Sequence, residues 1–576
     1  MDPLRLGDIT KDERSKYLFE NIVKGISDYG NCVGIPTVGG EIEFDESFNK
    51  NPLVNVVCIG LVEKDKIIRG IAPNPGDAML LVGNKTGRDG IHGVTFASEE
   101  LCETKSEADR PAVQIPDPFS KKSIIDSCLE AFATGHVTGC KDLGGGGFTC
   151  ASCEMLFKGK NGAKIDLEKL PLREADMEPW EILLSETQER MLLMVKKDKL
   201  KDIQAIFEKH DVPAAVVGEV IDEEKMEITW KGQVIVNTPP ELLAEGPTVE
   251  REAKATKRDV PLVVIEHPKE HFLKLLSDPN YGSKRWIYEQ YDHEVQIRTM
   301  SKPGMDAAVL RITDEEGVAI STDCNSDYCK INPYHGAMGA IVESIRNITS
   351  AGARPIAFVD CLNFANPEKP EAFWEFKEAV KGLAEAAEFF KVPFISGNVS
   401  FYNESDGVPI KPSPTVCCMG KLKLDTVVDM RFKETGNSII LVGESKNEIG
   451  FAEVDLHKEK KVNDFILDLV ESKQINACHD LSKGGLAVGL ARMAFPSDKG
   501  FCIRGATTEE LFSESHARYV ITAEDPKPIV SKAKEAGIQI KILGNVLGDV
   551  LDYGIFSVEL AEAKRKYKNA LEENLI

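Results

Sequence analysis

One short stretch of the sequence combines a side chain that could bind a metal ion with glycines whose backbone a ligand could approach. Asp142 precedes a run of four glycines, Gly144 to Gly147. Backbone without side chains lets a ligand come close, and a carboxylate is the hard oxygen donor that Mg²⁺ prefers. The same pattern is also typical of a helix cap or a turn. The stretch therefore indicates either a magnesium site or an ordinary turn.

Two further stretches carry polar side chains that suit small-molecule binding. Residues 186–188 read Glu-Thr-Gln after a predicted helix over residues 179–185, and their row of acceptors and donors suits ribose hydroxyls or an amide. Asn398 and Ser400 follow Gly397 on a predicted strand. Because side chains two apart on a strand share a face, both would point into one cleft.

A glycine-rich loop, residues 83–93, follows the predicted strand over residues 78–82. Its glycines would let backbone N–H groups approach an anion, and Lys85 and Arg88 add positive charge. A flexible surface loop is the alternative interpretation. The chain contains neither Gly-x-x-x-x-Gly-Lys-Ser/Thr nor a Gly-x-Gly-x-x-Gly that opens a helix, so any phosphate chemistry must use another scheme.

The composition excludes several classes of protein. At ~100–200 residues per domain, 576 residues suit several domains rather than one small module. Asp and Glu total 93 against 70 Lys and Arg, a net charge of -23, so no global basic field attracts nucleic acid or anionic lipid. The sequence has neither a membrane-length apolar run nor a signal-peptide pattern. We expect a cytoplasmic protein that binds neither nucleic acid nor membrane.

The sequence contains two copies of one plan, which we call copy one and copy two. Three pairs of matched segments carry the duplication, namely residues 35–44 and 392–401, 140–143 and 478–481, and 185–190 and 513–518. The spacing between the segments is also matched. A repeat of this size predicts that one structural unit is built twice.

Strand-like runs alternate with amphipathic helices in each copy, which predicts a mixed α/β (α+β) fold. The apolar spacing predicts a helix over residues 16–26, ending before Gly30, and its counterpart over residues 370–390. Each copy divides into two smaller domains, and a charged linker separates the copies. The expected boundaries are 1–63, 64–244, 245–302 for the linker, 303–423 and 424–576.

Five segments match the sequence pattern of one known family, namely residues 28–41, 86–93, 176–190, 286–293 and 396–403. Together they resemble phosphoribosylformylglycinamidine synthases, the synthetase family of de novo purine synthesis, and the resemblance runs over essentially the whole chain. It implies a tandem pair of aminoimidazole-ribotide-synthetase-like halves. That architecture agrees with the duplication found in the sequence.

The resemblance also implies roles for the matching residues. The substrate formylglycinamide ribotide (FGAR) would be bound by Gln114, Glu186, Thr187, Gln188 and Ser400. ATP would be bound by Asp360 and Gly397, and Mg²⁺ by Asp142 and Asn398. Thr187 departs from the family, which usually has serine there.

Copy one is expected to begin partway through its first domain. Met1 corresponds to Val359, and about sixty residues of copy two that precede this point, starting at Pro303, have no counterpart in copy one. The family's Ser-His-Asn-His-Pro-Ser segment, with its catalytic histidine, belongs to that region. No catalytic residue is therefore named, and we do not assign the role to His92.

The activity that the resemblance implies is the ATP-dependent conversion of FGAR to formylglycinamidine ribotide (FGAM). ATP would phosphorylate the amide oxygen, and ammonia would displace phosphate from the iminophosphate. The chain has no recognisable glutaminase nucleophile motif, so a glutaminase subunit and a small bridging subunit are expected partners. The alternative is a non-catalytic or split-chain remnant that acts as a nucleotide-binding partner subunit. A second enzyme interpretation is a selenophosphate synthetase or a thiamine-phosphate kinase. Those chains resemble one half only, and a full tandem pair argues against them.

Overall fold

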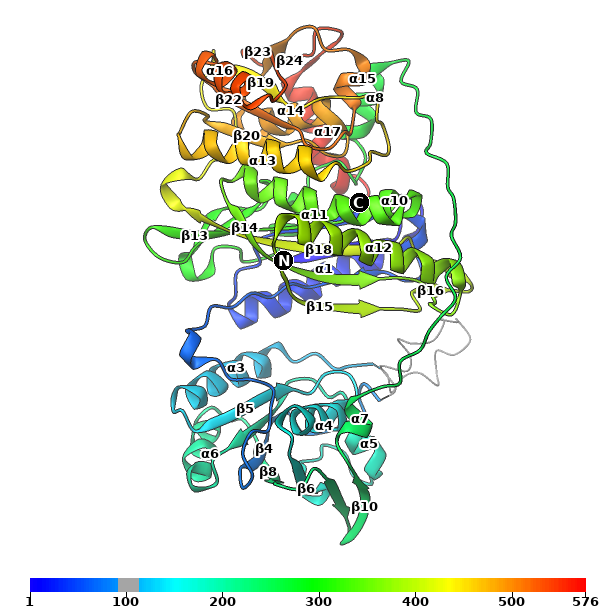
Figure 1. Ribbon diagram of the computed structural model, residues 1–576, viewed down its shortest axis with the longest axis vertical. Helices are drawn as coiled ribbons and strands as arrows, with labels where there is room; N and C mark the ends of the chain where they lie inside the picture. The colour runs from blue at the N-terminus through cyan, green and yellow to red at the C-terminus, as the bar shows by residue number, and fades with distance from the viewer. Residues whose placement is uncertain (92–112, 576) are drawn as a thin grey trace. The chain divides into compact units, whose positions relative to one another are not determined.

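The computed structural model describes residues 1–91 and 113–575. This part of the chain forms two compact units (Figure 1). Unit 1 comprises Met1–Asn31, Ile35–Cys58 and Arg251–Ile576, and unit 2 comprises Cys32–Gly34 and Ile59–Glu250. Across the described residues, no helix combines the length and the apolar character needed to cross a bilayer.

Unit 2 is a layered domain built on a mixed sheet with the strand order β10-β9-β6-β8-β4-β7-β5. The strands are β4 (Ala78–Gly83), β5 (Val137–Asp142), β6 (Gly162–Asp166), β7 (Arg190–Val195), β8 (Ala214–Ile221), β9 (Met226–Trp230) and β10 (Gln233–Thr238). The helices are α3 (Pro118–Ala133), α4 (Gly147–Gly159), α5 (Pro179–Leu184), α6 (Leu200–Lys209) and α7 (Glu241–Ala244).

Helices cover both faces of this sheet. Successive side chains of a strand point to opposite faces. In β4, Met79 and Leu81 therefore pack with α4 and α5, whereas Leu80 and Val82 pack with α3 and α6. All four side chains are buried, which explains why the strand reads as a continuous apolar run.

Unit 1 contains the copy-two counterpart of this domain, with the strand order β25-β24-β21-β23-β19-β22-β20. The strands are β19 (Ser438–Val442), β20 (Ala477–Asp480), β21 (Phe501–Ile503), β22 (Tyr519–Ala523), β23 (Ile540–Val546), β24 (Val550–Asp552) and β25 (Ser557–Glu559). The helices are α13 (Leu456–Glu471), α14 (Gly485–Ala494), α15 (Thr508–Phe512), α16 (Lys527–Ala536) and α17 (Leu560–Glu572). The sheet follows the same path as that of unit 2, so the predicted duplication is confirmed.

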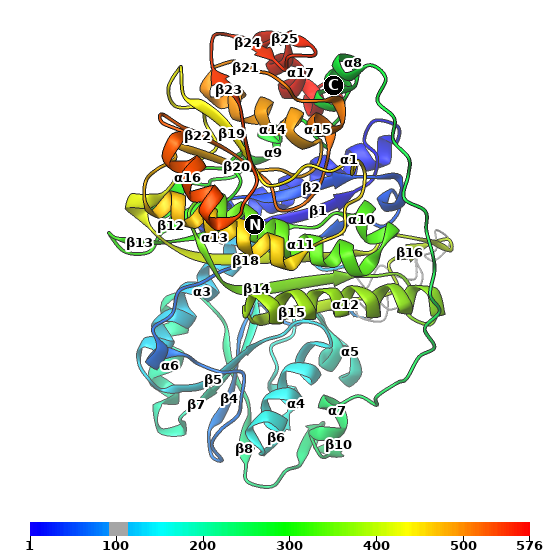
Figure 2. The same ribbon diagram turned by 45° about the horizontal axis from the view of Figure 1, so that its top comes forward.

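A second sheet of unit 1 has the order β11-β12-β13-β18-β14-β15. Its strands are β11 (Thr299–Ser301), β12 (Ala308–Arg311), β13 (Glu316–Asp323), β14 (Arg354–Asn363), β15 (Phe394–Ser400) and β18 (Ser413–Lys423), with a small hairpin of β16 (Glu404–Ser405) and β17 (Val408–Pro409). Its helices are α10 (Ser326–Ile331), α11 (Pro333–Ser350) and α12 (Pro370–Phe390). Helices α11 and α12 lie side by side against this sheet (Figure 2) and share its core. The helix predicted over residues 370–390 has the predicted bounds.

Copy one contributes β1 (Asp2–Leu6), α1 (Glu13–Val33), β2 (Gly40–Phe44) and β3 (Leu53–Val54) to unit 1. Strands β1 and β2 pair in parallel with Asp2 opposite Gly40, just as β14 and β15 pair with Asp360 opposite Gly397. The prediction that α1 ends before Gly30 is wrong. Ser27 and Asn31 both donate to the Gln290 carbonyl, and this tertiary contact carries the helix on to Val33.

The predicted linker, residues 245–302, contains α8 (Pro268–Leu276), α9 (Arg285–Tyr288) and the strand β11. Its aromatic patch packs on copy one, because Ile287 and Tyr291 share a core with Leu4 and Phe19. From Arg251 onward the linker is thus an integral part of unit 1 rather than a free tether.

Residues 251–258 of the linker, which we call the strap, form neither a helix nor a strand and pass the N-terminal end of α12 (Figure 1). The Lys254 N–H donates to the Pro370 carbonyl at 2.9 Å. Three ion pairs accompany it, namely Arg251 with Glu368 at 3.8 Å, Lys254 with Glu371 at 2.8 Å, and Arg258 with Glu375. The strap is therefore held mainly by charge.

Candidate functional site

The candidate substrate loop, residues 185–190, connects α5 to β7 in unit 2. Pro179 stands in the first turn of α5, and Glu178 and Glu181 form a capping box, so the helix start is well defined. Ser185 is the C-cap. The loop then turns at Glu189, whose φ of 62° lies in the left-handed region that few non-glycine residues adopt.

Glu186 has defined partners for both carboxylate oxygens. Its Oε1 accepts a hydrogen bond from the Gly146 N–H at 3.2 Å, and its Oε2 accepts one from Gln114 Nε2 at 2.9 Å. Gln188 Nε2 donates to the Glu186 carbonyl at 3.1 Å. The structure thus places two of the predicted substrate residues, Gln114 and Gln188, in contact with a third, Glu186.

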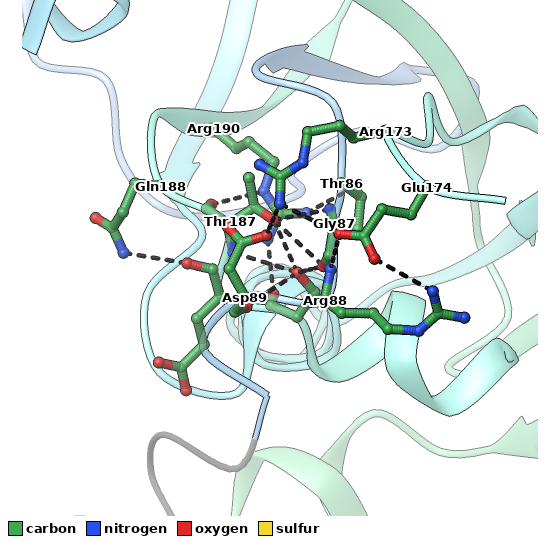
Figure 3. Close-up of polar contacts among 11 residues, drawn as sticks. Thr86, Gly87, Arg88, Asp89, Arg173, Glu174, Thr187, Gln188 and Arg190 are labelled. Carbon is green, nitrogen blue, oxygen red and sulfur yellow. Dashed lines mark hydrogen bonds and ion pairs between the residues drawn. The ribbon is translucent and has the colours of Figure 1, made fainter. Parts of the chain in front are cut away.

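The glycine-rich loop packs against the substrate loop (Figure 3). Four of its backbone N–H groups donate inside the protein: Thr86 to the Pro171 carbonyl at 2.8 Å, Gly87 to Thr187 Oγ1 at 2.9 Å, Arg88 to Glu174 at 2.9 Å, and Gly90 to the Val113 carbonyl at 3.2 Å. Neither the anion-binding nor the flexible-loop interpretation describes residues 86–90. His92 and Gly93 lie outside the described residues.

Charged side chains brace the same turn. Arg88 pairs with Glu174 at 3.2 Å and with Glu181 at 2.8 Å, and Arg173 pairs with Asp89 (Figure 3). The Arg88 hydrogen bond is the largest cause of a lowered pKa of Glu181. Of the two cations that the sequence suggested for an anion, Arg88 is therefore neutralised by nearby carboxylates.

Arg190 is the buried residue of this site that our sequence interpretation missed. Its guanidinium donates from Nε to the Thr187 carbonyl at 2.8 Å, from Nη2 to the Ser185 carbonyl at 2.6 Å and from Nη1 to Thr86 Oγ1 at 2.9 Å (Figure 3). The signal that could have found it is the repeat, since Arg518 occupies the same position in copy two.

Asp142 ends β5 and is exposed. The glycine turn that follows leads to Gly146, whose N–H binds Glu186. A Cβ on Gly144 would lie 3.3 Å from Asp142 Oδ2, so glycine keeps the space above the carboxylate open. An exposed carboxylate beside backbone without side chains fits the oxygen-rich coordination of Mg²⁺.

The copy-two residues belong to unit 1, where they lie on β14 and β15. Asp360 is opposite Gly397, and a Cβ on Gly397 would overlap the Asp360 carboxylate. Burial raises the pKa of Asp360 to about 6, against a lowering effect of the Asn398 N–H. Asn398 lies on the exposed part of β15 and offers an amide oxygen, and Ser400 Oγ is 3.1 Å from Asn403 Nδ2.

A cavity of about 540 Å³ lies within unit 1, where copy one meets the copy-two domains. Asp2, Gly40 and Glu41 line it, and the matched strand register makes them the counterparts of Asp360, Gly397 and Asn398. Arg5 pairs with Glu41 nearby. The sequence interpretation did not identify this cavity, although the repeat alignment contained its residues.

Asp306, His479 and Asp480, which also line or adjoin this cavity, form a cluster whose ligand atoms lie within 4.8 Å of one another. Asp306 Oδ1 lies 2.6 Å from His479 Nδ1. Burial, and then the Asp306 charge, raise the pKa of Asp480 to about 7. One imidazole and two carboxylates suit a divalent cation chemically.

Family models match both halves of the chain. The model of the AIR synthase related protein, N-terminal domain, matches residues 1–62 and 304–422, and that of the C-terminal domain matches residues 74–231 and 434–554. The tandem arrangement of two-domain halves is therefore independently supported.

Curated relatives and solved structures agree. The chain is 47% identical to the phosphoribosylformylglycinamidine synthase subunit PurL of Methanothermobacter marburgensis over 99% of this chain and 84% of the relative. It is 48% identical to that of Thermococcus sibiricus over 100% and 84%. The structure of T. maritima PurL complexed with FGAR matches with a TM-score of 0.77 and 31% identity, covering 95% and 83% of the two chains. The complex with ATP matches with a TM-score of 0.74 and 30% identity, covering 95% and 82%.

Proposed function

Because the chain belongs to the PurL family of phosphoribosylformylglycinamidine synthase subunits, we propose that it converts FGAR to FGAM with ATP in purine biosynthesis. One observation in the site carries the proposal. The Glu186 carboxylate is held between the Gly146 N–H and the exposed Gln114 side chain. A ligand can replace Gln114 at that carboxylate without disturbing the backbone contact.

The substrate residues have complementary tasks. The Glu186 carboxylate accepts hydrogen bonds from FGAR donors, and the amides of Gln114 and Gln188 supply both a donor and an acceptor. Ser400, on β15 of unit 1, is the copy-two residue proposed to bind FGAR. The Thr187 hydroxyl accepts the Gly87 N–H at 2.9 Å, so its contribution is to set the loop beside the substrate.

Asp360 and Gly397 bind ATP in this proposal. Asp142 in unit 2 and Asn398 in unit 1 are each proposed as a ligand of Mg²⁺. The absence of a Cβ at Gly397 lets the nucleotide approach β15 closely, since this strand has no room for a side chain beside Asp360. Mg²⁺, when bound, supplies charge neutralisation on the phosphates. Near pH 7 Asp360, with a pKa of about 6, is mostly ionised and can accept hydrogen bonds.

The reaction transfers the γ-phosphoryl group of ATP to the amide oxygen of FGAR. An amide oxygen is a poor leaving group until it is phosphorylated, and ammonia then displaces phosphate from the iminophosphate to give FGAM. The protein positions the reactants and excludes water. A glutaminase subunit supplies the ammonia, and a small bridging subunit joins the two.

The test is to incubate the full chain with FGAR, MgATP and ammonium, and to measure ADP and FGAM, with FGAR binding followed by calorimetry. We expect ADP release that depends on FGAR. ADP release without FGAR dependence would contradict the assignment. Nucleotide binding without turnover would favour the nucleotide-binding partner subunit instead.

A further inference from the structure

The Arg190 side chain is almost fully buried, yet its three described hydrogen bonds go to neutral groups. It is 2% exposed, and its acceptors are the carbonyls of Ser185 and Thr187 and the hydroxyl of Thr86. Within the described residues it makes no ion pair with a carboxylate inside 4.0 Å. Burial lowers its pKa to about 10. Burying such a charge is costly, so its hydrogen bonds must be well directed.

These bonds define the shape of the substrate loop. Alternate carbonyls of an extended segment point the same way. The Ser185 and Thr187 carbonyls therefore both reach the guanidinium, whereas the Glu186 carbonyl between them points away and accepts a hydrogen bond from Gln188. The planar guanidinium presents its donors in a rigid fork. The backbone on either side of Glu186 is therefore fixed by one side chain.

The same guanidinium also fixes the neighbouring turn. Its bond to Thr86 Oγ1 ties the substrate loop to residues 86–90. In that turn the Asp89 carbonyl accepts the Glu186 N–H at 3.0 Å. Arg190 therefore holds the backbone on either side of Glu186 directly, and through Thr86 it also holds the turn that carries the Asp89 carbonyl.

Copy two repeats this arrangement around a different loop. Arg518 donates from Nε to the Ser515 carbonyl at 2.7 Å, from Nη2 to the Ser513 carbonyl at 2.6 Å and from Nη1 to Ser445 Oγ at 2.9 Å. The residue before it, Ala517, has a φ of 55°, as Glu189 has a φ of 62°. The fork is therefore a repeated device, and Arg518 offers a matched control.

We propose that Arg190 is a positioning residue for substrate binding: by fixing the carbonyls of Ser185 and Thr187 and the hydroxyl of Thr86, it holds Glu186 where FGAR reaches it. The inference rests on the proposed function of the loop. Arg190 does not itself touch the substrate. Its effect must therefore appear in FGAR affinity and loop order, and not in ATP binding.

The test compares Arg190→Lys with Arg518→Lys in the full chain. Lysine keeps the charge but cannot span two carbonyls and a hydroxyl as a planar fork does. For R190K we expect FGAR affinity and KM to worsen by about tenfold or more, the size of one to two lost charged hydrogen bonds. ATP affinity should stay within about twofold. R518K should leave both affinities within about twofold.

Hydrogen exchange of the peptides that contain residues 185–189 and 513–517 completes the test. R190K should accelerate exchange in the first peptide only, and R518K in the second only. Unchanged exchange and unchanged FGAR affinity in R190K would overturn the inference. If the unmodified chain bound no FGAR, the proposed function would fail, and the exchange data would still decide whether Arg190 orders the loop.

Discussion

The loops at residues 185–190 and 513–518 share one backbone design but hold their carboxylates differently. In both, one oxygen accepts a glycine N–H, from Gly146 to Glu186 at 3.2 Å and from Gly484 to Glu514 at 2.8 Å. The other oxygen of Glu186 meets the exposed Gln114 side chain. That of Glu514 accepts from the buried Tyr328 hydroxyl at 2.8 Å and the Gly450 N–H at 3.0 Å.

The difference shows how a duplicated loop can keep its scaffold and change its use. An exposed amide can be displaced by a ligand at low cost, whereas a buried phenol and a backbone N–H cannot move without disturbing the fold. At the position of Gln188, copy two has His516, whose ring makes a T-shaped contact with the Tyr328 ring. We conclude that the copy-one loop suits binding and the copy-two loop suits structure.

The largest effect is expected for alanine at the glycine that supports each loop. Gly90 and Gly450 both have positive φ, 68° and 82°, but a Cβ on Gly90 would overlap Glu186, whereas on Gly450 its nearest contact is 3.8 Å away. G90A should therefore destabilise unit 2 by at least about 3 kcal/mol, and G450A should destabilise unit 1 by about 1 kcal/mol. Urea unfolding, monitored by hydrogen exchange in each unit, measures the loss of stability in both variants. Equal losses in G90A and G450A would contradict the comparison.

The next effect separates binding from stability at the two carboxylates. Glu186→Gln should weaken FGAR binding by about tenfold, because it removes the charge from the hydrogen bonds that the substrate makes. Its stability should change by less than about 1 kcal/mol, since Gln114 can rotate its amide to match. Glu514→Gln should do the reverse, costing unit 1 about 2 kcal/mol as its amide faces two buried donors, with FGAR affinity unchanged. Calorimetry measures FGAR affinity and urea unfolding measures stability. If both variants changed affinity and stability in the same way, the assignment of Glu186 to binding and Glu514 to structure would be refuted.

The pH dependence of unit 1 tests the burial of His516. Burial, then the charges of Arg346 and Arg518, hold the pKa of His516 well below its usual value. As pH falls through about 6.5, the unfolded chain gains a proton that the folded chain does not bind, so stability is lost on the acidic side. Copy one has glutamine, Gln188, at this position. His516→Gln should therefore reduce the loss of unfolding free energy between pH 7.5 and 5.5 by about 1.4 kcal/mol. Urea unfolding at both pH values measures this difference, and identical pH slopes would show that His516 is free to protonate.

The smallest effect is expected at Thr187. Thr187→Ser keeps the hydroxyl that accepts from Gly87, and copy two already uses Ser515 to accept from the Lys446 N–H at 3.1 Å. FGAR affinity should therefore stay within about twofold. Thr187→Val is the control, because it leaves the Gly87 N–H without its acceptor and should cost about 1–3 kcal/mol. A strong effect of T187S would mean that the methyl group, and not the hydroxyl, sets the loop.

Features that repeat within the sequence could be predicted, and features made by distant contacts could not. The duplication and the bounds of α12 follow from matched spacing and apolar periodicity. The contacts of residues 86–90 in the glycine-rich loop could not be predicted, because their N–H partners, such as Pro171 and Glu174, are more than eighty residues away. The length of α1 escaped for the same reason, because its contact is with the distant Gln290 carbonyl. The Arg190 fork escaped although the Ser185 and Thr187 carbonyls are close in sequence, because a carbonyl acceptor leaves no mark on side-chain composition.

The charged contact between the strap and α12 has a consequence for proteolysis. Arg251, Lys254 and Arg258 are all residues after which trypsin cuts, and their ion pairs hold that stretch of backbone against the helix. The pairs of Arg251 and Lys254 are the more exposed ones, and exposed pairs weaken as salt screens them. A nick at the strap should therefore become faster with rising ionic strength while the folded cores resist digestion, which makes the linker a salt-controlled cutting point between the two copies.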